Sequence, residues 1–378
     1  MKRGIIMNIY IGKNIKRLRR ERNITQEELA ERMNISAPAV SKWERNETLP
    51  DITMVLPLAS YFGVTTDELL GFDETKNEEQ IQWYIDESHR LNAIGKLKEA
   101  FDIICQAYSE FPNDFRIIEE YMWKLTYDPN CEEPYGNEVH KDELYKLCNR
   151  VLDECTLDSP RYSALSILSG LYVLDGQTDK AIEVCKRFPG FWTTQGEELE
   201  YIYDSGSEEW WKHMRENVGN IAGMLYVKLR NAALCCKESP EEKMRRYEKA
   251  EAFIKLIYED GDYGFSHSYL AETYIYIGNC CASMDNFEKA VEYYDKGLYH
   301  SHQFDKLPKL TTHTSYLVRG NVHDMSKIYA GLEENSVWLN LRFIRESWVY
   351  PKLKDLPQMQ EIIAKYEPYA GKRKDYAE

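Results

Sequence analysis

Hydrophobic positions near the N-terminus recur with the period of an α-helix. Ile11, Ile15 and Leu18 are spaced by three or four residues and form one apolar stripe, and Arg22 is the last position of that stripe. This spacing is typical of an amphipathic helix that buries one face. The other faces carry basic side chains, namely Lys13, Lys16, Arg17 and Arg20. Such residues form either a solvated helix face or a phosphate-contacting one, and the pattern leaves both alternatives open.

Capping signals predict two further helices. Thr25-Gln-Glu-Glu28 is a capping box, in which a hydroxyl and a carboxylate satisfy amides at a helix start. The second helix should therefore run to about Met33. Ser36 is expected to cap a third helix that ends near Arg45, because Pro38 is tolerated in a first turn.

Two further helices, the second of them short, complete the N-terminal region. Asp51 is expected to cap a fourth helix that ends near Gly63, and Thr65 opens a second capping box before a short fifth helix. We therefore predict a five-helix head at residues 1–72. Residues 73–80 are polar and charged, and we interpret them as a linker or as an exposed helix entry.

The remaining body, residues 81–378, keeps helical periodicity without strand-like alternation, so the fold class is predicted to be all-α. Helices are expected around residues 208–233 and 247–258. The segments 338–348 and 358–366 should close the domain.

Small residues recur in the body at a spacing typical of helical hairpins. A turn residue is followed five positions later by alanine at Gly95 and Ala100, Gly176 and Ala181, and Asp285 and Ala290. Residues 271–298 resemble the tetratricopeptide repeat (TPR) at Tyr274, Ile277, Gly278, Phe287, Ala290 and Tyr294. The candidate repeats are not separated by multiples of about 34 residues, so an irregular TPR-like α-solenoid is expected.

Charge is divided unevenly along the chain. The net charge is −15, yet residues 1–72 hold 11 Lys and Arg against 9 Asp and Glu, a net of +2, which leaves −17 on the other 306 residues. A basic head on an acidic body is typical of a DNA-reading module joined to a separate partner domain. Nine cysteines without a CxxC pair and no apolar run of about 18 residues indicate a cytoplasmic protein. Met7 is an alternative to Met1 as the start.

The third helix has two distinct faces. Val40, Trp43 and Glu44 point to one side, whereas the opposite side carries Pro38, Ser41, Lys42 and Arg45. The first face should pack, and the second is available to enter a major groove, which admits one α-helix.

The head resembles the Cro-like, or xenobiotic-response-element (XRE), family of helix-turn-helix transcriptional regulators. The resemblance rests on IKRLRRERNITQEELAERMNISAPAVSKWERNETLPDI, followed by LASYFGVTTDELLG. It implies a recognition helix at 36–45 in which Ser36 is a DNA-binding residue and Ala37, Pro38, Ser41 and Lys42 face bases. It also implies phosphate contacts from Thr25, Gln26 and Arg45 or Asn46. Ala37 and Pro38 cannot make bidentate hydrogen bonds, so thymine-methyl contact or shape readout is expected there.

Two charged residues of the head are assigned a structural role. Arg19 lies on the apolar stripe four residues after Ile15, and Glu44 lies beside Trp43 on the packing face. Opposite charges on two inward faces indicate a buried ion pair, and the resemblance implies the same bridge.

Other candidate sites were weighed against simpler roles. Cys235-Cys236 and Cys280-Cys281 lack metal-site spacing and are expected to be packing residues. His300 and His302 match no catalytic motif, so neither an enzyme, a cofactor nor a metal is predicted. Aromatic residues at 263–276 could line a groove, and Asn279 is the candidate effector contact, with an inter-helix hydrogen bond as its alternative role.

These observations predict a sequence-specific, homodimeric transcriptional regulator that binds double-stranded DNA. The TPR-like domain would supply dimer contacts or sense an effector, with a peptide or protein as the ligand class. The alternative is an interaction adaptor in which the acidic solenoid recruits a basic partner and the head binds DNA only weakly. A thiol- or metal-sensing repressor is a third hypothesis.

Overall fold

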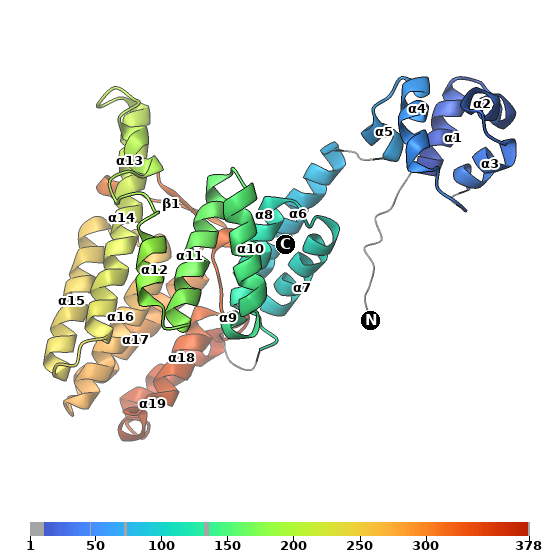
Figure 1. Cartoon of the computed structure of the whole chain (residues 1–378). Helices are drawn as coiled ribbons and strands as arrows, with labels where there is room; N and C mark the ends of the chain where they lie inside the picture. Colours follow the sequence, from blue (N-terminus) through green and yellow to red (C-terminus); the bar gives the residue numbers. More distant parts are fainter. Residues whose placement is uncertain (1–10, 46, 72–73, 132–135, 377–378) are drawn as a thin grey trace. The chain divides into compact units, whose positions relative to one another are not determined.

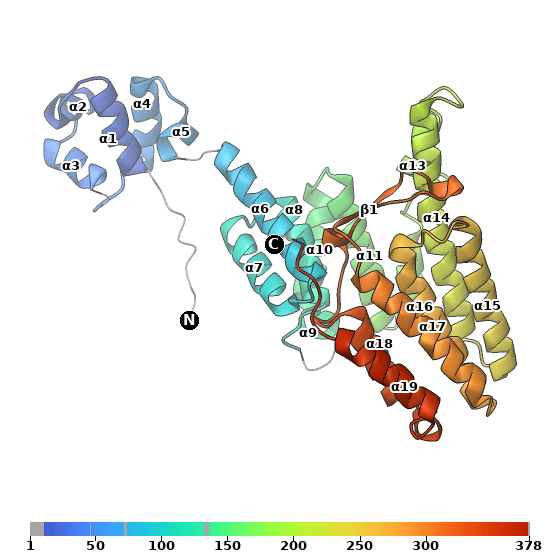
Figure 2. The same cartoon turned by 180° about the vertical axis from the view of Figure 1, so that it is seen from behind.

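The computed structural model describes residues 11–45, 47–71, 74–131 and 136–376 (Figures 1 and 2). The chain divides into two compact units. Unit 1 comprises residues 1–86 and 103–121, and unit 2 comprises residues 87–102 and 122–378. The head predicted from the sequence lies within unit 1.

The head contains the five predicted helices: α1 (Ile11–Glu21), α2 (Gln26–Met33), α3 (Ala37–Glu44), α4 (Ile52–Phe62) and α5 (Thr66–Leu70). Its core is built from Ile15, Leu29, Val40, Leu58 and Leu69, each with no exposed surface. One residue from each helix thus meets at the centre, as the sequence periodicity predicts.

Helix starts in the head follow the predicted caps with one exception. Thr25 and Glu28 form the complete reciprocal capping box, Asp51 accepts from the Thr53 amide, and Thr65 accepts from the Glu68 amide. Ser36 occupies the N-cap position of α3, but its side chain makes no capping hydrogen bond. The start of α3 therefore depends on Pro38 in its first turn and on packing of its apolar face.

Helices α6 (Glu74–Ala93), α7 (Leu97–Glu110) and α8 (Phe115–Thr126) follow the head. Residues 74–80, expected as a linker or a helix entry, belong to α6. Within unit 1, Ile81 and Tyr84 of α6 share a small core with Ala107 and Ile117. An acidic and polar composition did not prevent helix formation, because one face of α6 gains these apolar contacts.

Unit 2 continues with helical hairpins. Its first group is α9 (Gly136–Val139), α10 (Lys141–Glu154), α11 (Asp158–Leu174) and α12 (Thr178–Cys185). After α13 (Gln195–Glu200), consecutive neighbours α14 (Glu208–Leu234), α15 (Pro240–Ile257), α16 (His267–Ser283) and α17 (Phe287–Asp305) lie side by side in both views (Figures 1 and 2). Helices α18 (Ser336–Glu346) and α19 (Pro357–Tyr366) close the array against α17. The predicted irregular α-solenoid is confirmed.

Two glycines bring α16 and α17 into close contact. A Cβ atom on Gly278 would lie 2.7 Å from the Tyr294 ring, and one on Gly297 would lie 2.7 Å from Ile275 Cγ1. The TPR-like spacing of small residues thus has a direct packing reason, because a side chain at either position would separate the helices.

The predicted all-α fold class is confirmed, with the addition of one short β-hairpin that the sequence did not predict. Strand β1 (Leu310–Thr312) pairs antiparallel with β2 (Val322–Asp324), with Thr311 opposite His323. Unit 2 also contains short 3-10 helices. Those before α16 and around the hairpin are η1 (Gly264–Ser266), η2 (Tyr316–Val318) and η3 (Met325–Lys327), and those next to α18 and α19 are η4 (Tyr350–Lys352) and η5 (Glu367–Tyr369). Three-residue strands are too short to produce a detectable period of two in the sequence.

The C-terminal segment packs on the end of α6 within unit 2. The Ala330 amide donates to the Asn92 carbonyl at 3.0 Å, and Arg90 pairs with Asp375. Gly95 has φ +79°, and a Cβ there would lie 2.1 Å from the Leu332 carbonyl oxygen. Only glycine fits this position, for both conformational and steric reasons. Among the described residues, no helix is both long and apolar enough to cross a membrane.

The contact between α16 and α17 gives a stability prediction. Gly278→Ala should destabilise unit 2 by about 1–3 kcal/mol, because the methyl group overlaps the Tyr294 ring. Thermal unfolding of the full chain measures this effect. Gly170→Ala in α11 is the matched control, because its new Cβ meets nothing within 4 Å, and it should be neutral or stabilise by up to about 1 kcal/mol. Equal loss in both variants would contradict the packing argument.

Candidate nucleic-acid interface and effector groove

A buried ion pair joins α1 to α3, as predicted. Arg19 Nε donates to Glu44 Oε1 at 2.6 Å, and Nη2 donates to Oε2 at 2.9 Å. The two side chains are 12% and 2% exposed. Arg19 Nη1 also donates to the Ile24 carbonyl at 2.7 Å, so the guanidinium spans α1, the start of α2 and α3. Bidentate geometry of this kind restricts orientation as well as distance.

Gln26 completes this network from α2. Its amide donates to Glu44 Oε2 at 2.7 Å. Burial raises the pKa of the Glu44 carboxyl, but hydrogen bonds from Arg19 and Gln26 outweigh burial and leave that pKa below its ordinary value. The same pairing raises the pKa of Arg19. Both groups are therefore charged at neutral pH, and the polar side chains of three helices meet at one carboxylate.

The network holds α3 with one face inward and one outward. Val40, Trp43 and Glu44 are buried, whereas Pro38 and Lys42 are exposed and Ser41 is half-buried. This arrangement matches the two faces predicted from the sequence. Ala37 is half-buried and packs against the head core, so less of its side chain is available to a base than the resemblance implied.

Arg45 makes intramolecular contacts in this structure. Its Nη1 donates to Ser41 Oγ at 2.7 Å, and its Nε and Nη2 donate to the Glu47 carboxylate at 2.8 and 3.0 Å. The hydrogen bonds that Arg45 donates to Glu47 raise the pKa of Arg45 and lower the pKa of Glu47. Both side chains are about half exposed, so a phosphate can compete for the guanidinium at small cost. Asn46 lies outside the described residues.

The predicted DNA-binding residues outside α3 have mixed environments. Thr25 and Ser36 are exposed, but the Thr25 hydroxyl is already used in the capping box. Gln26 donates one of its two amide hydrogens to Glu44 Oε2. Arg17 pairs with Glu21 at 3.0 Å and approaches Glu68 at 3.6 Å. Part of the basic face of α1 is therefore neutralised within the head.

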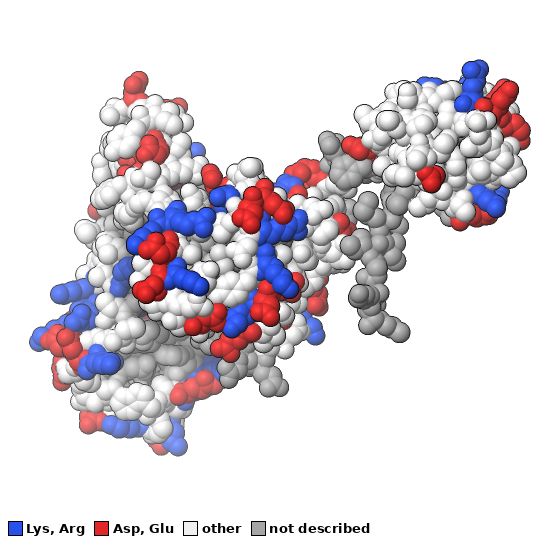
Figure 3. Space-filling view, viewed as in Figure 1, with Lys and Arg blue, Asp and Glu red and all other residues white. Residues whose placement is uncertain are grey.

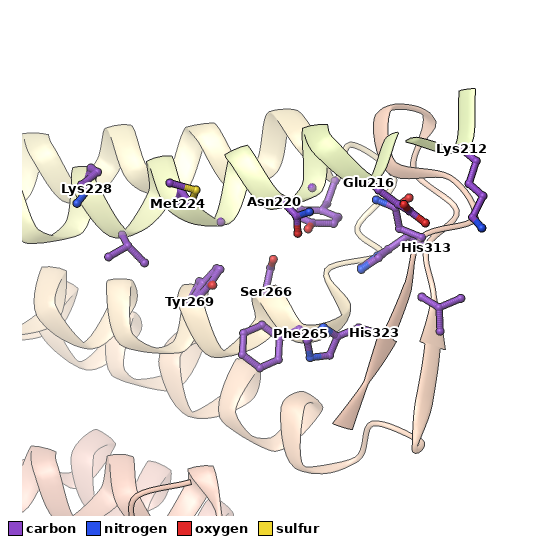
Figure 4. Close-up of a pocket in the computed structure, with 17 residues that line it drawn as sticks. Lys212, Glu216, Asn220, Met224, Lys228, Phe265, Ser266, Tyr269, His313 and His323 are labelled. Atoms are coloured by element: carbon purple, nitrogen blue, oxygen red, sulfur yellow. The ribbon is translucent and has the colours of Figure 1, made fainter. Parts of the chain in front are cut away.

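A groove lies between α14 and α16 in unit 2, bounded at one end by the β-hairpin. Its cavity volume is about 890 Å³. Asn220 and Met224 line it from α14, Tyr269 from α16, and His313 and His323 from the hairpin segment (Figure 4). We call this cavity the α14–α16 groove. Its size and mixed lining are typical of ligand sites.

A second cavity of about 670 Å³ adjoins the first. The two share Phe265, Tyr269, Val322 and His323 as lining residues. The second cavity extends toward α18, where Asn340 and Arg373 contribute to its wall. A ligand longer than a single small molecule could therefore extend from α14 past the hairpin to α18.

The hairpin is fixed from two sides. Asp262 Oδ2 accepts from the Thr314 amide and from His313 Nδ1, the latter at 3.2 Å. Asn321 Nδ2 donates to the Arg215 carbonyl of α14 at 2.7 Å. A Cβ on Gly219 would lie 3.0 Å from that amide nitrogen. The hairpin is thus held against the groove by specific polar contacts.

His323 presents an unsatisfied polar atom beside the groove. Its Nε2 is buried and has no hydrogen-bond partner among the described residues. Burial lowers the pKa of His323, and neighbouring His313 lowers it further. The imidazole is therefore neutral at pH 7 and can donate or accept one hydrogen bond. Buried polar atoms normally have a partner, so a bound ligand would remove this deficit.

The groove residues differ from the predicted effector contact. Asn279 Oδ1 accepts from the Tyr294 hydroxyl at 2.7 Å, which is the inter-helix alternative. Asn279 is not among the side chains that line either cavity. Phe265 and Tyr269, which the sequence had placed in an aromatic cluster, do line them. No sequence pattern predicted the histidines of the hairpin segment as groove residues. Their positions depend on contacts between residues about 50 positions apart, such as the contact of His313 with Asp262.

Among the remaining candidates, Cys280, Cys281 and His300 pack inside unit 2, whereas Cys235 is exposed and Cys236 is half-buried, so the expected packing role is wrong for Cys235. Cys280 and Cys281 are buried, and Cys281 Sγ contacts Met244 Sδ at 3.8 Å. His300 Nδ1 lies 2.7 Å from His267 Nδ1. Burial lowers the pKa of His267 to about 4 and that of His300 to about 3, so both are neutral at pH 7.

Surface charge of the body is interspersed on the face in Figure 3, where Lys and Arg alternate with Asp and Glu. Described pairs include Lys141 with Asp175 and Arg150 with Glu154. The excess negative charge does not form a continuous acidic surface on this face. On this face the charges therefore offer no continuous acidic surface to a basic partner.

Comparisons with known proteins identify the family. The helix-turn-helix family profile matches residues 15–69. The HTH-type transcriptional regulator ImmR of Bacillus subtilis (strain 168) is 40% identical over 107 residues, covering 28% of this chain and 80% of ImmR. This chain belongs to the helix-turn-helix family of transcriptional regulators. The predicted XRE-type head is confirmed.

Other relatives match over smaller parts or at lower similarity. The HTH-type transcriptional activator BcrR of Enterococcus faecalis is 39% identical over 63 residues, and the chain spans only 31% of its length. The structure of Bacillus thuringiensis PlcR in complex with the peptide PapR7 and DNA covers 77% of this chain and 93% of PlcR, with 18% identity and a TM-score of 0.29. The fold of unit 2 is therefore described from the contacts between its own helices and not from this likeness.

The ion pair of this regulator gives a pH-dependent stability prediction. Glu44→Ala should destabilise the head by about 3–5 kcal/mol at pH 7, because it leaves the Arg19 guanidinium buried without its partner. The folded-state pKa of Glu44 lies below its ordinary value of 4.5. The stability it contributes is therefore present above about pH 4.5 and is lost as pH falls through the folded-state value.

Hydrogen exchange of the α1–α3 amides in the full chain measures this effect. The difference between wild type and Glu44→Ala should shrink as the pH is lowered below about 4.5. Glu47→Ala is the matched control, because its partner Arg45 is exposed, and it should change exchange by little. A difference that stays constant with pH would show that the charge of Glu44 is not the source of the stability.

Proposed function

We propose that this regulator binds DNA as a homodimer, with α3 of each head in the major groove. The observation that carries the proposal is the orientation of α3. The buried Arg19–Glu44 pair faces inward, and Pro38, Ser41 and Lys42 lie on the opposite, solvent-facing side. A rigid helix with an exposed polar ridge is the geometry that major-groove readout requires.

The residues divide into base-facing and phosphate-facing sets. Ser41 and Lys42 carry hydrogen-bonding groups that can reach base edges, whereas Pro38 can offer only apolar contact to a thymine methyl group. Arg45 is assigned to a phosphate, for which it would exchange its contact with Glu47. Gln26 and Thr25, at the start of α2, are assigned to a phosphate. The main-chain amides of the first turn of α2 carry the positive end of the helix dipole, which also favours a phosphate there.

Apolar side chains near the start of α4 support the pairing of two heads. Leu49, Ile52 and Leu56 are 53%, 82% and 69% exposed. Ile52 and Leu56 lie one helical turn apart, so they share a face. Exposed apolar clusters of this kind mark protein contacts. Two adjacent half-sites on DNA would bring two heads together, so we assign a second copy of the head to this surface.

We also propose that the α14–α16 groove binds a short peptide effector. Its two joined cavities provide length, Phe265 and Tyr269 provide apolar surface, and the unsatisfied His323 Nε2 provides a hydrogen-bonding atom. An extended peptide offers alternating apolar side chains and main-chain polar groups, which fit this lining. Regulation then consists of binding without a catalytic step, and it takes place in the cytoplasm.

Selection of genomic DNA fragments tests the DNA-binding proposal. The purified full chain should enrich an inverted repeat at near-physiological salt, because two α3 helices read two half-sites. The Ser41→Ala/Lys42→Ala double variant should lose that enrichment. Arg45→Ala should weaken binding to all sequences and reduce the slope of log affinity against log salt by about 1.

Lys186→Ala is the control for the loss of a positive charge. Lys186 is an exposed lysine of unit 2 and is paired with Glu183, as Arg45 is paired with Glu47. It should enrich the same inverted repeat as the wild type. If the Ser41→Ala/Lys42→Ala variant enriched that repeat as well, α3 would not be the reading helix.

Peptide selection tests the effector groove. A random linear peptide library displayed on phage, panned against the full chain, should yield peptides whose affinity is then measured by fluorescence anisotropy. Met224→Arg places a charged side chain in the groove and should lower that affinity at least about tenfold. Leu256→Arg is the control, because Leu256 is 65% exposed on α15 and is not among the groove residues. Equal loss in both variants, or none in Met224→Arg, would place the peptide elsewhere.

A further inference from the structure

Three potential metal ligands of different chemistry meet at the end of α8. Asp128 and Cys131 lie in the turn that follows α8, and His140 is the N-cap residue of α10. Their ligand atoms all lie within 4.8 Å of one another. The three come from a D-x₂-C-x₈-H spacing, which matches none of the common metal motifs, so the sequence alone did not single them out.

The local backbone holds these side chains together. The Cys131 amide donates to the Asp128 carbonyl at 3.2 Å, and the His140 amide donates to the Gly136 carbonyl at 2.9 Å. A Cβ on Gly136 would lie 2.2 Å from the Leu125 carbonyl oxygen. Glycine at this position thus allows the segment before α10 to lie directly against the end of α8, which brings His140 next to Asp128.

The hydrogen bonds of Asp128 orient its carboxylate. Oδ1 accepts from the amide and the side chain of Asn130 at 2.8 and 2.9 Å, and Oδ2 lies 2.8 Å from His140 Nε2. Asp128 is buried, and Cys131 and His140 are half-buried. Ligands that are fixed by hydrogen bonds and partly shielded from water are typical of metal sites.

We propose that Asp128, Cys131 and His140 bind a divalent transition-metal ion of the zinc type. One oxygen, one sulfur and one nitrogen ligand suit Zn²⁺ and Co²⁺, whereas Mg²⁺ and Ca²⁺ prefer oxygen ligands throughout. Metal–ligand bonds of about 2.0–2.3 Å place tetrahedral ligand atoms about 3.2–3.8 Å apart. A slight opening of the Asp128–His140 contact and a short inward movement of Cys131 reach that geometry, and water would take the fourth position.

The two pairs of adjacent cysteines in unit 2 do not meet two further potential metal ligands among the described residues. Cys235 and Cys236 are adjacent, and Cys236 Sγ contacts the Glu238 carboxylate at 3.2 Å. Cys280 and Cys281 are buried in the core around α16. Within the described residues, the group formed by Asp128, Cys131 and His140 is the one in which three such ligands meet.

Cobalt titration of the tag-free, reduced full chain tests the proposal. Co²⁺ should bind with one equivalent that shows a thiolate-to-metal charge-transfer band and the visible absorption of tetrahedral cobalt. Cys131→Ser should abolish the charge-transfer band, and His140→Gln should weaken binding at least about tenfold. Cys185→Ser is the matched control, because Cys185 is an exposed cysteine of α12, and its spectrum should equal that of the wild type.

Protection from alkylation provides a test that needs no variant. Stoichiometric Zn²⁺ should slow the alkylation of Cys131, mapped by mass spectrometry, and should leave the exposed Cys185 unchanged as an internal control. A charge-transfer band that persists in Cys131→Ser, or no band in the wild type, would overturn the proposal. Equal alkylation of Cys131 with and without Zn²⁺ would overturn it as well.

Discussion

The buried pair of Arg19 and Glu44 is the contact on which the organisation of the head depends. One guanidinium bonds the carboxylate of α3 and the carbonyl of Ile24, while Gln26 bonds the same carboxylate from α2. The charges are shielded from water, so neither can lose its partner without a large desolvation penalty. The pair therefore fixes the orientation of α3, and the outward placement of Ser41 and Lys42 follows from it.

Unit 2 depends on a different constraint, which is the close approach of backbones at glycine. Gly278 and Gly297 let α16 and α17 pack at short distance, and Gly219 lets the β-hairpin approach α14. The α14–α16 groove exists because the hairpin is held there by Asp262 and Asn321. The proposed effector groove thus arises from packing between distant segments, whereas the proposed DNA-reading surface of the head belongs to a single helix.

Contacts in the folded protein decided the roles of Asn279, residues 74–80 and Ser36. Asn279 occupies the expected repeat position, yet the Tyr294 hydroxyl is close enough to take its side-chain oxygen. Residues 74–80 are polar enough for a linker, yet the apolar face of α6 extends the helix through them. Ser36 stands at the N-cap position without making the capping bond. For Asn279 and α6 a contact with another segment decided the outcome, whereas Ser36 lacks a hydrogen bond within its own helix start.

Sequence by itself determined the helices of the head, their caps, the two faces of α3 and the Arg19–Glu44 pair, because all of these depend on periodicity and on residues within one small module. It also determined the predominantly helical character of unit 2 and the close packing at Gly278. Tertiary structure alone decided the hairpin, the groove, the unsatisfied His323 and the meeting of Asp128, Cys131 and His140. These features join residues whose proximity comes from chain reversal and long-range packing, and neither leaves a periodic signal in the sequence.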